Sequence, residues 1–144
     1  QYAHGNEPSH HVVYLYNYVD QPWKTQELIP EIFERFYKPK PGGLCGNDDC
    51  GQMSAWYILN AMGFYQVCPG KPVYSIGRPL FNEATVHLKD GKSFKVIAHN
   101  NSRDNKYVRS IVLNGNKLET PFFTHQDIVD GGTLELTMGS EPLK

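Results

Sequence analysis

The chain has 144 residues, of which 40% are hydrophobic and 20% charged, and its formal net charge is −1. This composition is typical of one ordinary globular domain or two small ones, and it excludes a disordered chain. No apolar run approaches the ~20 residues that span a bilayer. A net charge this close to zero gives no field that recruits nucleic acid. We therefore expect no membrane span and no nucleic-acid partner.

Three segments of the first half have the apolar spacing of helices, and they cover residues 8–19, 25–37 and 50–62. Thr25 is the expected N-cap of the second helix, because its hydroxyl can accept from a free backbone N–H. Gly63 is the expected left-handed residue that ends the third helix. The first helix would face the core with the side chains at helical spacing, which are Val12, Leu15, Tyr16 and Val19.

The second half has short alternating runs separated by Gly, Asn and Asp. Asp90-Gly91 and Asn114-Gly115 each lie between two such runs, and they predict two β-hairpins. Residues 124–129 predict one helical turn capped by Thr124, and residues 133–138 predict a final strand. The fold class is therefore α+β, with helices over residues 1–70 and a small antiparallel β-sandwich or sheet over residues 71–144.

A first polar cluster, His4-Gly5-Asn6-Glu7, precedes the first helix. Asn6 and Glu7 offer an amide and a carboxylate oxygen, the ligand types that calcium prefers, although calcium needs roughly six to eight ligands. The alternative is a capping loop with surface histidines. Zinc held by His10 and His11 is disfavoured, because adjacent side chains of a helix diverge.

A second cluster places Asp48 and Asp49 between glycines, just before the third helix. A carboxylate at a helix N-terminus stays ionised, which suits a general base. The alternative is that both aspartates only cap the helix. Capping explains one aspartate well and the second poorly.

The chain has three cysteines, Cys45, Cys50 and Cys68, and an odd number is a poor disulfide framework. We expect at least one of them to be a small buried side chain without a functional role. A Cys45–Cys50 pair in an oxidising compartment is the alternative. A zinc or thiol enzyme is disfavoured, because no ligand spacing supports it.

Several linked motifs resemble the C-terminal part of glycoside hydrolase family 92. The resemblance runs through nearly the whole chain in order, which makes it more specific than any single motif. The motifs are His4-Gly5-Asn6-Glu7-Pro8-Ser9-His10-His11, Tyr14-Leu15-Tyr16-Asn17, Gln21-Pro22-Trp23-Lys24-Thr25, Gly46-Asn47-Asp48-Asp49, Gly51-Gln52-Met53-Ser54-Ala55-Trp56, Gly63-Phe64-Tyr65, Pro69-Gly70, Ile76-Gly77-Arg78-Pro79-Leu80-Phe81, Thr124-His125-Gln126-Asp127-Ile128 and Gly131-Gly132-Thr133-Leu134.

The resemblance implies an exo-acting α-mannosidase, often specific for α-1,2 linkages, that needs Ca²⁺ and inverts the anomeric centre. The catalytic domain of such enzymes is an (α/α)6 barrel that follows a large β-sandwich domain. This chain would then supply the final helices of the barrel, followed by the small antiparallel β portion. The expected partners are mannose-containing glycans and the upstream part of the same polypeptide. The expected location is periplasmic or secreted, in a bacterium.

The resemblance also implies roles for single residues. Asp49 corresponds to the general base, with Asp48 as the alternative, and Asn6 and Glu7 correspond to calcium ligands. His4 corresponds to a position near the leaving sugar. The substrate-side residue Asn47 stands where some family members carry a further Asp. The general acid corresponds to a segment upstream of this chain, so we expect the isolated chain to be inactive. A stand-alone carbohydrate-binding or interaction module is the alternative function.

Overall fold

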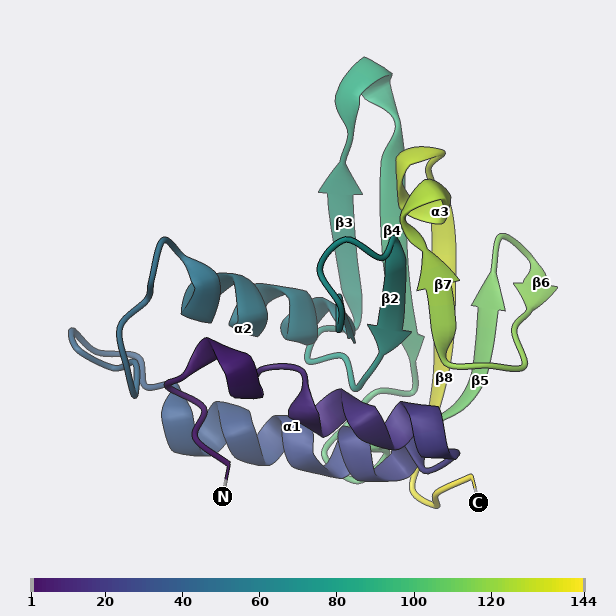
Figure 1. The fold of residues 1–144 in the computed structure, drawn as a ribbon. Helices are drawn as coiled ribbons and strands as arrows, with labels where there is room; N and C mark the ends of the chain where they lie inside the picture. Colours follow the sequence, from purple (N-terminus) through teal and green to yellow (C-terminus); the bar gives the residue numbers. More distant parts are fainter. Residues whose placement is uncertain (1, 144) are drawn as a thin grey trace.

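A computed structural model describes residues 2–143. Its first half is helical, and its second half is built mainly of strands that rise from the helices (Figure 1). The α+β fold class is therefore confirmed. The helical segments are the 3₁₀ helices η1 (Glu7–Ser9) and η2 (Val12–Val19) and the α-helices α1 (Pro22–Phe36) and α2 (Gln52–Met62).

The segment η2 differs from the expected first helix in type and in the face that it buries. Its core side chains include Val13, Tyr14 and Asn17, whereas Leu15 is 46% and Val19 58% exposed, so the predicted face was wrong. A 3₁₀ helix repeats every three residues. Tyr14 and Asn17, three apart, therefore point the same way and make the buried hydrogen bonds. Tyr14 donates to the Asn60 side chain at 2.6 Å and Asn17 donates to the Ser75 hydroxyl at 2.9 Å.

Helix α1 begins at Pro22, three residues before the predicted cap. Proline suits a first helical turn, because its missing N–H would have no helical partner there. Thr25 is buried and donates its hydroxyl to the Val13 carbonyl at 2.7 Å, so it anchors η2 to α1 and caps neither. Helix α2 ends at Gly63 with φ 103°, which confirms the predicted left-handed residue.

The larger sheet has five strands in the order β3-β4-β8-β5-β6. Both predicted hairpins are confirmed: β3 pairs antiparallel with β4 and β5 with β6. Strand β8 lies between β4 and β5, parallel to β4 and antiparallel to β5. The sheet is thus antiparallel except at the β4–β8 pair. The strand bounds are β3 Glu83–His87, β4 Ser93–His99, β5 Tyr107–Leu113, β6 Asn116–Lys117 and β8 Gly132–Gly139.

A second sheet of three short strands was not indicated by the sequence. Its order is β1-β2-β7, with β1 at Phe64–Tyr65, β2 at Val73–Ile76 and β7 at Phe122–Thr124. Strand β7 leads into α3 (His125–Val129), where Thr124 and Asp127 form the predicted capping box.

Contacts join the two halves of the chain across residue 70. Strands β1 and β2 pair across it, and Leu59 of α2 packs against both hydrophobic cores. The Val108 backbone N–H donates to the side chain of Gln26 on α1 at 3.1 Å. These contacts fix the strands against the helices that carry the site. No helix within residues 2–143 is long and apolar enough to cross a bilayer.

Candidate active site at two crossing loops

The two polar clusters meet where two backbones cross at glycines. A Cβ on Gly46 would lie 2.7 Å from the carbonyl oxygen of Gly5, and a Cβ on Gly5 would lie 3.0 Å from the carbonyl oxygen of Cys45. Only a residue without a side chain allows such an approach. The crossing brings the loop with Asn6 and Glu7 beside the loop with Asp48 and Asp49, which are more than 40 residues away in the sequence.

The carboxyl groups of Glu7 and Asp49 lie against each other at this crossing. Their interaction raises the pKa of Asp49, through a shared hydrogen bond and through the negative charge of Glu7, and it lowers the pKa of Glu7. Two adjacent carboxylates repel each other when both are ionised. The Glu7 Oε1 atom is buried and has no hydrogen-bond partner within residues 2–143. An unpaired buried oxygen beside a second carboxylate leaves negative charge that nothing in the described chain neutralises.

Asp49 begins a turn of unusual backbone conformation. Asp49, Cys50 and Gly51 have φ values of 45°, 59° and 89°, so three consecutive residues are left-handed. For residues with a side chain this conformation costs roughly 1–2 kcal/mol each. Such strain is kept where the surrounding structure needs the geometry, often at functional sites. Here it turns the chain into α2 while leaving the Asp49 side chain exposed.

Asp48 has a different environment from Asp49. Its carboxylate accepts from the backbone N–H and the hydroxyl of Ser54, both at 2.8 Å. These hydrogen bonds hold the pKa of Asp48 below its usual range. Asp48 therefore caps the start of α2, whereas Asp49 makes no such contact with the helix. The capping interpretation accounts for one aspartate and leaves the other free for chemistry.

His4 lies in the interior, although its predicted role places it near a sugar. It is 1% exposed, and its ring nitrogens are hydrogen-bonded to the hydroxyls of Tyr2 and Tyr37, each at 2.7 Å. Burial, and then the neighbouring His10, lower the pKa of His4 to about 4. A sugar reaches His4 only if Tyr2 or Tyr37 moves. In this arrangement His4 supports the loop, and its contact with substrate stays a prediction.

A polar network behind the crossing was not singled out from the sequence. The Gln52 amide bridges His10 Nδ1 at 3.3 Å and the Tyr65 hydroxyl at 3.1 Å. The other ring nitrogen of His10 is hydrogen-bonded to the His4 carbonyl at 2.9 Å, and the Trp56 indole donates to the His10 carbonyl at 3.0 Å. The sequence shows histidines next to a capping loop, and this pattern is as typical of a surface site as of a buried network. Only the fold shows that this network fixes the first loop onto α2.

The remaining candidates lie at the surface. Asn6 and Asn47 are exposed on the two crossing loops. Within residues 2–143 no three His, Cys, Asp or Glu side chains form a group that could hold a metal ion on their own. Cys45, Cys50 and Cys68 are all free and exposed, so the expectation of a buried cysteine was wrong. They lie in loops outside the regular helices and strands.

The glycine crossing gives a testable expectation for stability. We expect Gly46→Ala to lower the free energy of unfolding by about 1–3 kcal/mol, because the new methyl group meets a backbone carbonyl that cannot rotate away. Urea unfolding of the two proteins measures the difference. A change within about 0.5 kcal/mol, typical of surface substitutions, would contradict the close approach.

The fold agrees with the family to which the whole chain can be assigned. Residues 1–140 match the model of the glycosyl hydrolase family 92 catalytic domain. The chain therefore belongs to glycosyl hydrolase family 92.

Known proteins agree with this assignment. An uncharacterized secreted glycosidase of Arthroderma benhamiae is 31% identical over 140 residues, which are 95% of this chain and 18% of that protein. The family 92 α-mannosidase BT3965 of Bacteroides thetaiotaomicron, solved with mannoimidazole, is 48% identical with a TM-score of 0.92, over 99% of this chain and 19% of that one. The inverting family 92 mannosidase BT2199 of the same species is also 48% identical, with a TM-score of 0.89, over 98% of this chain and 19% of that one. The chain thus spans about a fifth of the length of these relatives.

Proposed function

We propose that this chain is part of a calcium-dependent exo-α-mannosidase that releases terminal α-1,2-linked mannose with inversion. The observation that carries the proposal is the glycine crossing, which sets the Glu7 carboxylate against that of Asp49. Family membership and the likeness to an inverting mannosidase agree with it. A secreted or periplasmic location in a bacterium, with mannose-containing glycans as substrates, belongs to the same proposal.

Asp49 is the proposed general base. Inversion needs a base that removes a proton from water while the water attacks the anomeric carbon from the face opposite the leaving group. Asp49 is exposed, so a water molecule can reach its carboxylate and give up a proton to it. Asp48, which is hydrogen-bonded to Ser54, holds the loop in place. Asn47 lies next to this pair on the same loop and faces solvent, where a substrate hydroxyl can meet it.

The first loop fits a calcium ion by its chemistry. The unpaired buried Oε1 of Glu7 is an oxygen that a hard cation would satisfy, and the exposed Asn6 offers a further one. The other ligands would come from backbone carbonyls, water, substrate or the rest of the enzyme. When bound, calcium would supply a positive charge that attracts the hydroxyl oxygens of the sugar. His4 and its two tyrosine partners hold the first loop from behind.

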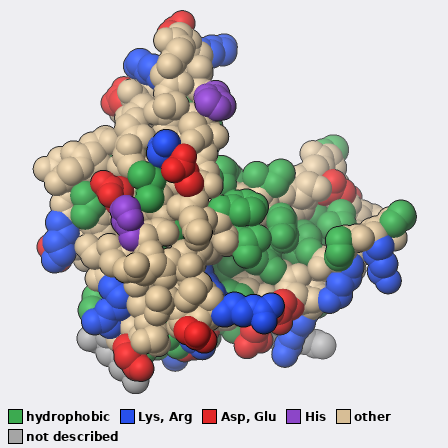
Figure 2. Space-filling view, turned by 180° about the vertical axis from the view of Figure 1, so that it is seen from behind, with side chains coloured by type: hydrophobic (Ala, Val, Ile, Leu, Met, Phe, Trp, Pro, Cys, Tyr) green, Lys and Arg blue, Asp and Glu red, His purple; other side chains and the backbone are tan. Residues whose placement is uncertain are grey.

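The exposed apolar side chains of the helical half are the proposed contact with the upstream part of the polypeptide. Seen from behind, hydrophobic side chains gather over the helices, and the strand half is mostly polar (Figure 2). Ile58 on α2 is 57% exposed, and Leu15 and Val19 are exposed on η2. Apolar helix faces are normally covered by a partner surface. We place the remaining barrel helices against them.

Mannose release from an α-1,2-mannobioside tests the proposal. We expect the whole enzyme to release mannose, and a chelator to abolish the release until calcium is restored. The 144-residue chain alone is expected to give none, because the resemblance places the general acid outside it. Activity that survives the chelator would contradict the metal assignment. Release by the isolated chain would contradict the expectation that the general acid lies outside it. No release by the whole enzyme would favour a sugar-binding module without catalysis.

A further inference from the structure

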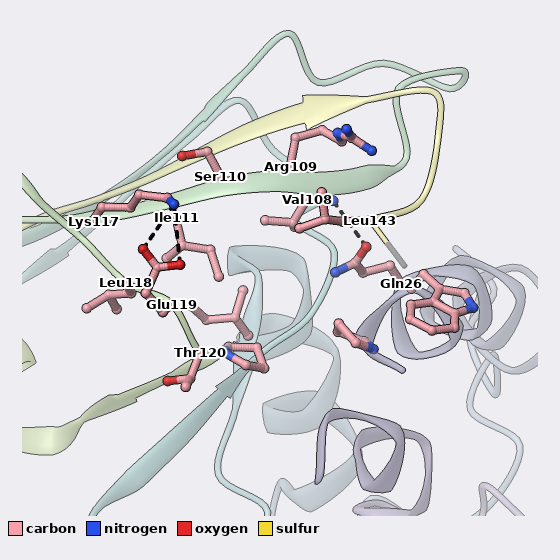
Figure 3. A pocket seen from close by; sticks show the side chains of 14 residues that line it. Gln26, Val108, Arg109, Ser110, Ile111, Lys117, Leu118, Glu119, Thr120 and Leu143 are labelled. Atoms are coloured by element: carbon pink, nitrogen blue, oxygen red, sulfur yellow. Dashed lines mark hydrogen bonds and ion pairs between the residues drawn. The ribbon is translucent and has the colours of Figure 1, made fainter. Parts of the chain in front are cut away.

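A pocket lies away from the two loops of the candidate catalytic site. It is a cavity of about 140 Å³ between the first turn of α1 and the strands β5 and β6 (Figure 3). None of the residues that line it belongs to the loops with Glu7 or Asp49. Its floor is apolar, and it consists of Ile76, Val108, Ile111 and Leu118.

The pocket contains one buried amide whose donor is free. Gln26 is 4% exposed, and its oxygen accepts from the Val108 backbone N–H at 3.1 Å. A backbone N–H can bond only to the oxygen of the amide, so the orientation of the side chain is fixed. The nitrogen therefore points away from Val108 toward the pocket (Figure 3). No atom of residues 2–143 is hydrogen-bonded to it. The nitrogen is not among the buried atoms left without a partner, so it is accessible from the pocket, where water or a ligand can accept from it.

The charged groups at the rim make contacts with other parts of the chain. Lys117 forms an ion pair with Glu119 at 3.0 Å. Arg109 donates to the backbone carbonyls of Glu141 and Pro142, so its guanidinium is turned toward the C-terminal segment. Lys117 is thus neutralised by Glu119, and the positive charge of Arg109 is directed away from the pocket. The pocket offers an apolar floor and a free amide donor, and Trp23 is one of its lining residues.

We propose that this pocket is an accessory site for a single neutral sugar ring. A pyranose has an apolar C–H face, which suits the floor and the indole of Trp23, and hydroxyl oxygens, which suit the amide of Gln26. The volume is below the roughly 300–1,000 Å³ of pockets for larger ligands, so it accommodates one ring.

Binding of methyl α-D-mannopyranoside to the whole enzyme tests this site. Isothermal titration calorimetry is expected to show a weak binding event, with Kd on the order of 1–10 mM, in addition to any at the catalytic site. Trp23→Ala should weaken that event about tenfold. Gln26→Glu keeps the acceptor for the Val108 N–H and removes the amide donors, so it should also weaken binding, by about threefold. Because this second variant leaves Trp23 in place, it tests the site even if Trp23→Ala fails to fold.

The matched control is Phe81→Ala, since Phe81 is an aromatic residue 50% exposed in the loop between β2 and β3 and outside the pocket. It should bind as the unmodified enzyme does. The hydrolysis rate of a mannobioside should be the same in all four proteins, which separates this site from the catalytic one. Equal binding in all four proteins would overturn the proposal. Binding of N-acetyl-leucinamide in place of the glycoside would also overturn it, because the pocket would then take an apolar peptide side chain.

Discussion

Asp49→Asn in the whole enzyme is expected to lower kcat for mannobioside hydrolysis by about a thousandfold. A positioned general base contributes roughly 10²–10⁴ in rate, and an amide cannot accept the proton of the attacking water. Asparagine is chosen because it tolerates the left-handed backbone that Asp49 has at φ 45°. Alanine would add backbone strain, and the loss of the base could then not be separated from the effect of that strain. Steady-state kinetics with and without added calcium measure the change.

Asp90→Asn is the matched control for this variant. Asp90 is also exposed and left-handed, with φ 62°, but it lies in the β3–β4 turn. The same chemical change there should leave kcat unaltered. If Asp49→Asn keeps kcat within tenfold of the unmodified enzyme, the base is Asp48 or a residue outside this chain.

Glu7→Gln is expected to produce opposite effects on stability and on calcium binding. Without calcium, the variant should be as stable as the unmodified enzyme or more so, because the repulsion between Glu7 and Asp49 is removed. With calcium, it should lose most of the stabilisation that the ion gives, and half-maximal activity should need about tenfold more calcium or higher. Thermal unfolding and activity, each titrated with calcium, measure the two effects.

The control for Glu7 is Glu34→Gln, an exposed carboxylate on α1 outside the crossing loops. It should change neither the unfolding temperature with calcium nor the calcium requirement. If Glu7→Gln retains a normal calcium response, Glu7 is a partner of Asp49 only, and the ion binds elsewhere. If it is destabilised without calcium, the two carboxyl groups share a proton that the fold needs.

The elements that local chemistry determines were predictable from the sequence. The Asp90-Gly91 and Asn114-Gly115 turns, the Thr124 cap and the Gly63 helix end depend on residues within a few positions of each other. The exposed face of η2 was not predictable. Its periodicity is real, but the apolar stripe that we assigned to this chain's own core faces outward. A pattern of apolar residues indicates that one face of a helix packs against another surface. It does not indicate whether that surface belongs to this chain.

The site was predictable in its residue types and not in its geometry. Both acidic clusters were visible, and the sequence suggested that capping explains only one aspartate. The Ser54 contacts show that this one is Asp48. The crossing at Gly5 and Gly46 depends on two segments far apart in the chain, so no local pattern reveals it. The burial of His4 follows from that same crossing and from tyrosines on either side.

The position of β8 has a consequence for the order in which this part of the protein is made. It is the last strand along the described chain, yet it lies in the centre of the five-stranded sheet, between β4 and β5. During synthesis the β3–β4 and β5–β6 hairpins leave the ribosome first, and each exposes an edge that waits for β8. The sheet is closed only when the final strand arrives between them. The sheet can therefore form only after β8 has been made, and the growing chain carries two unpaired strand edges until then.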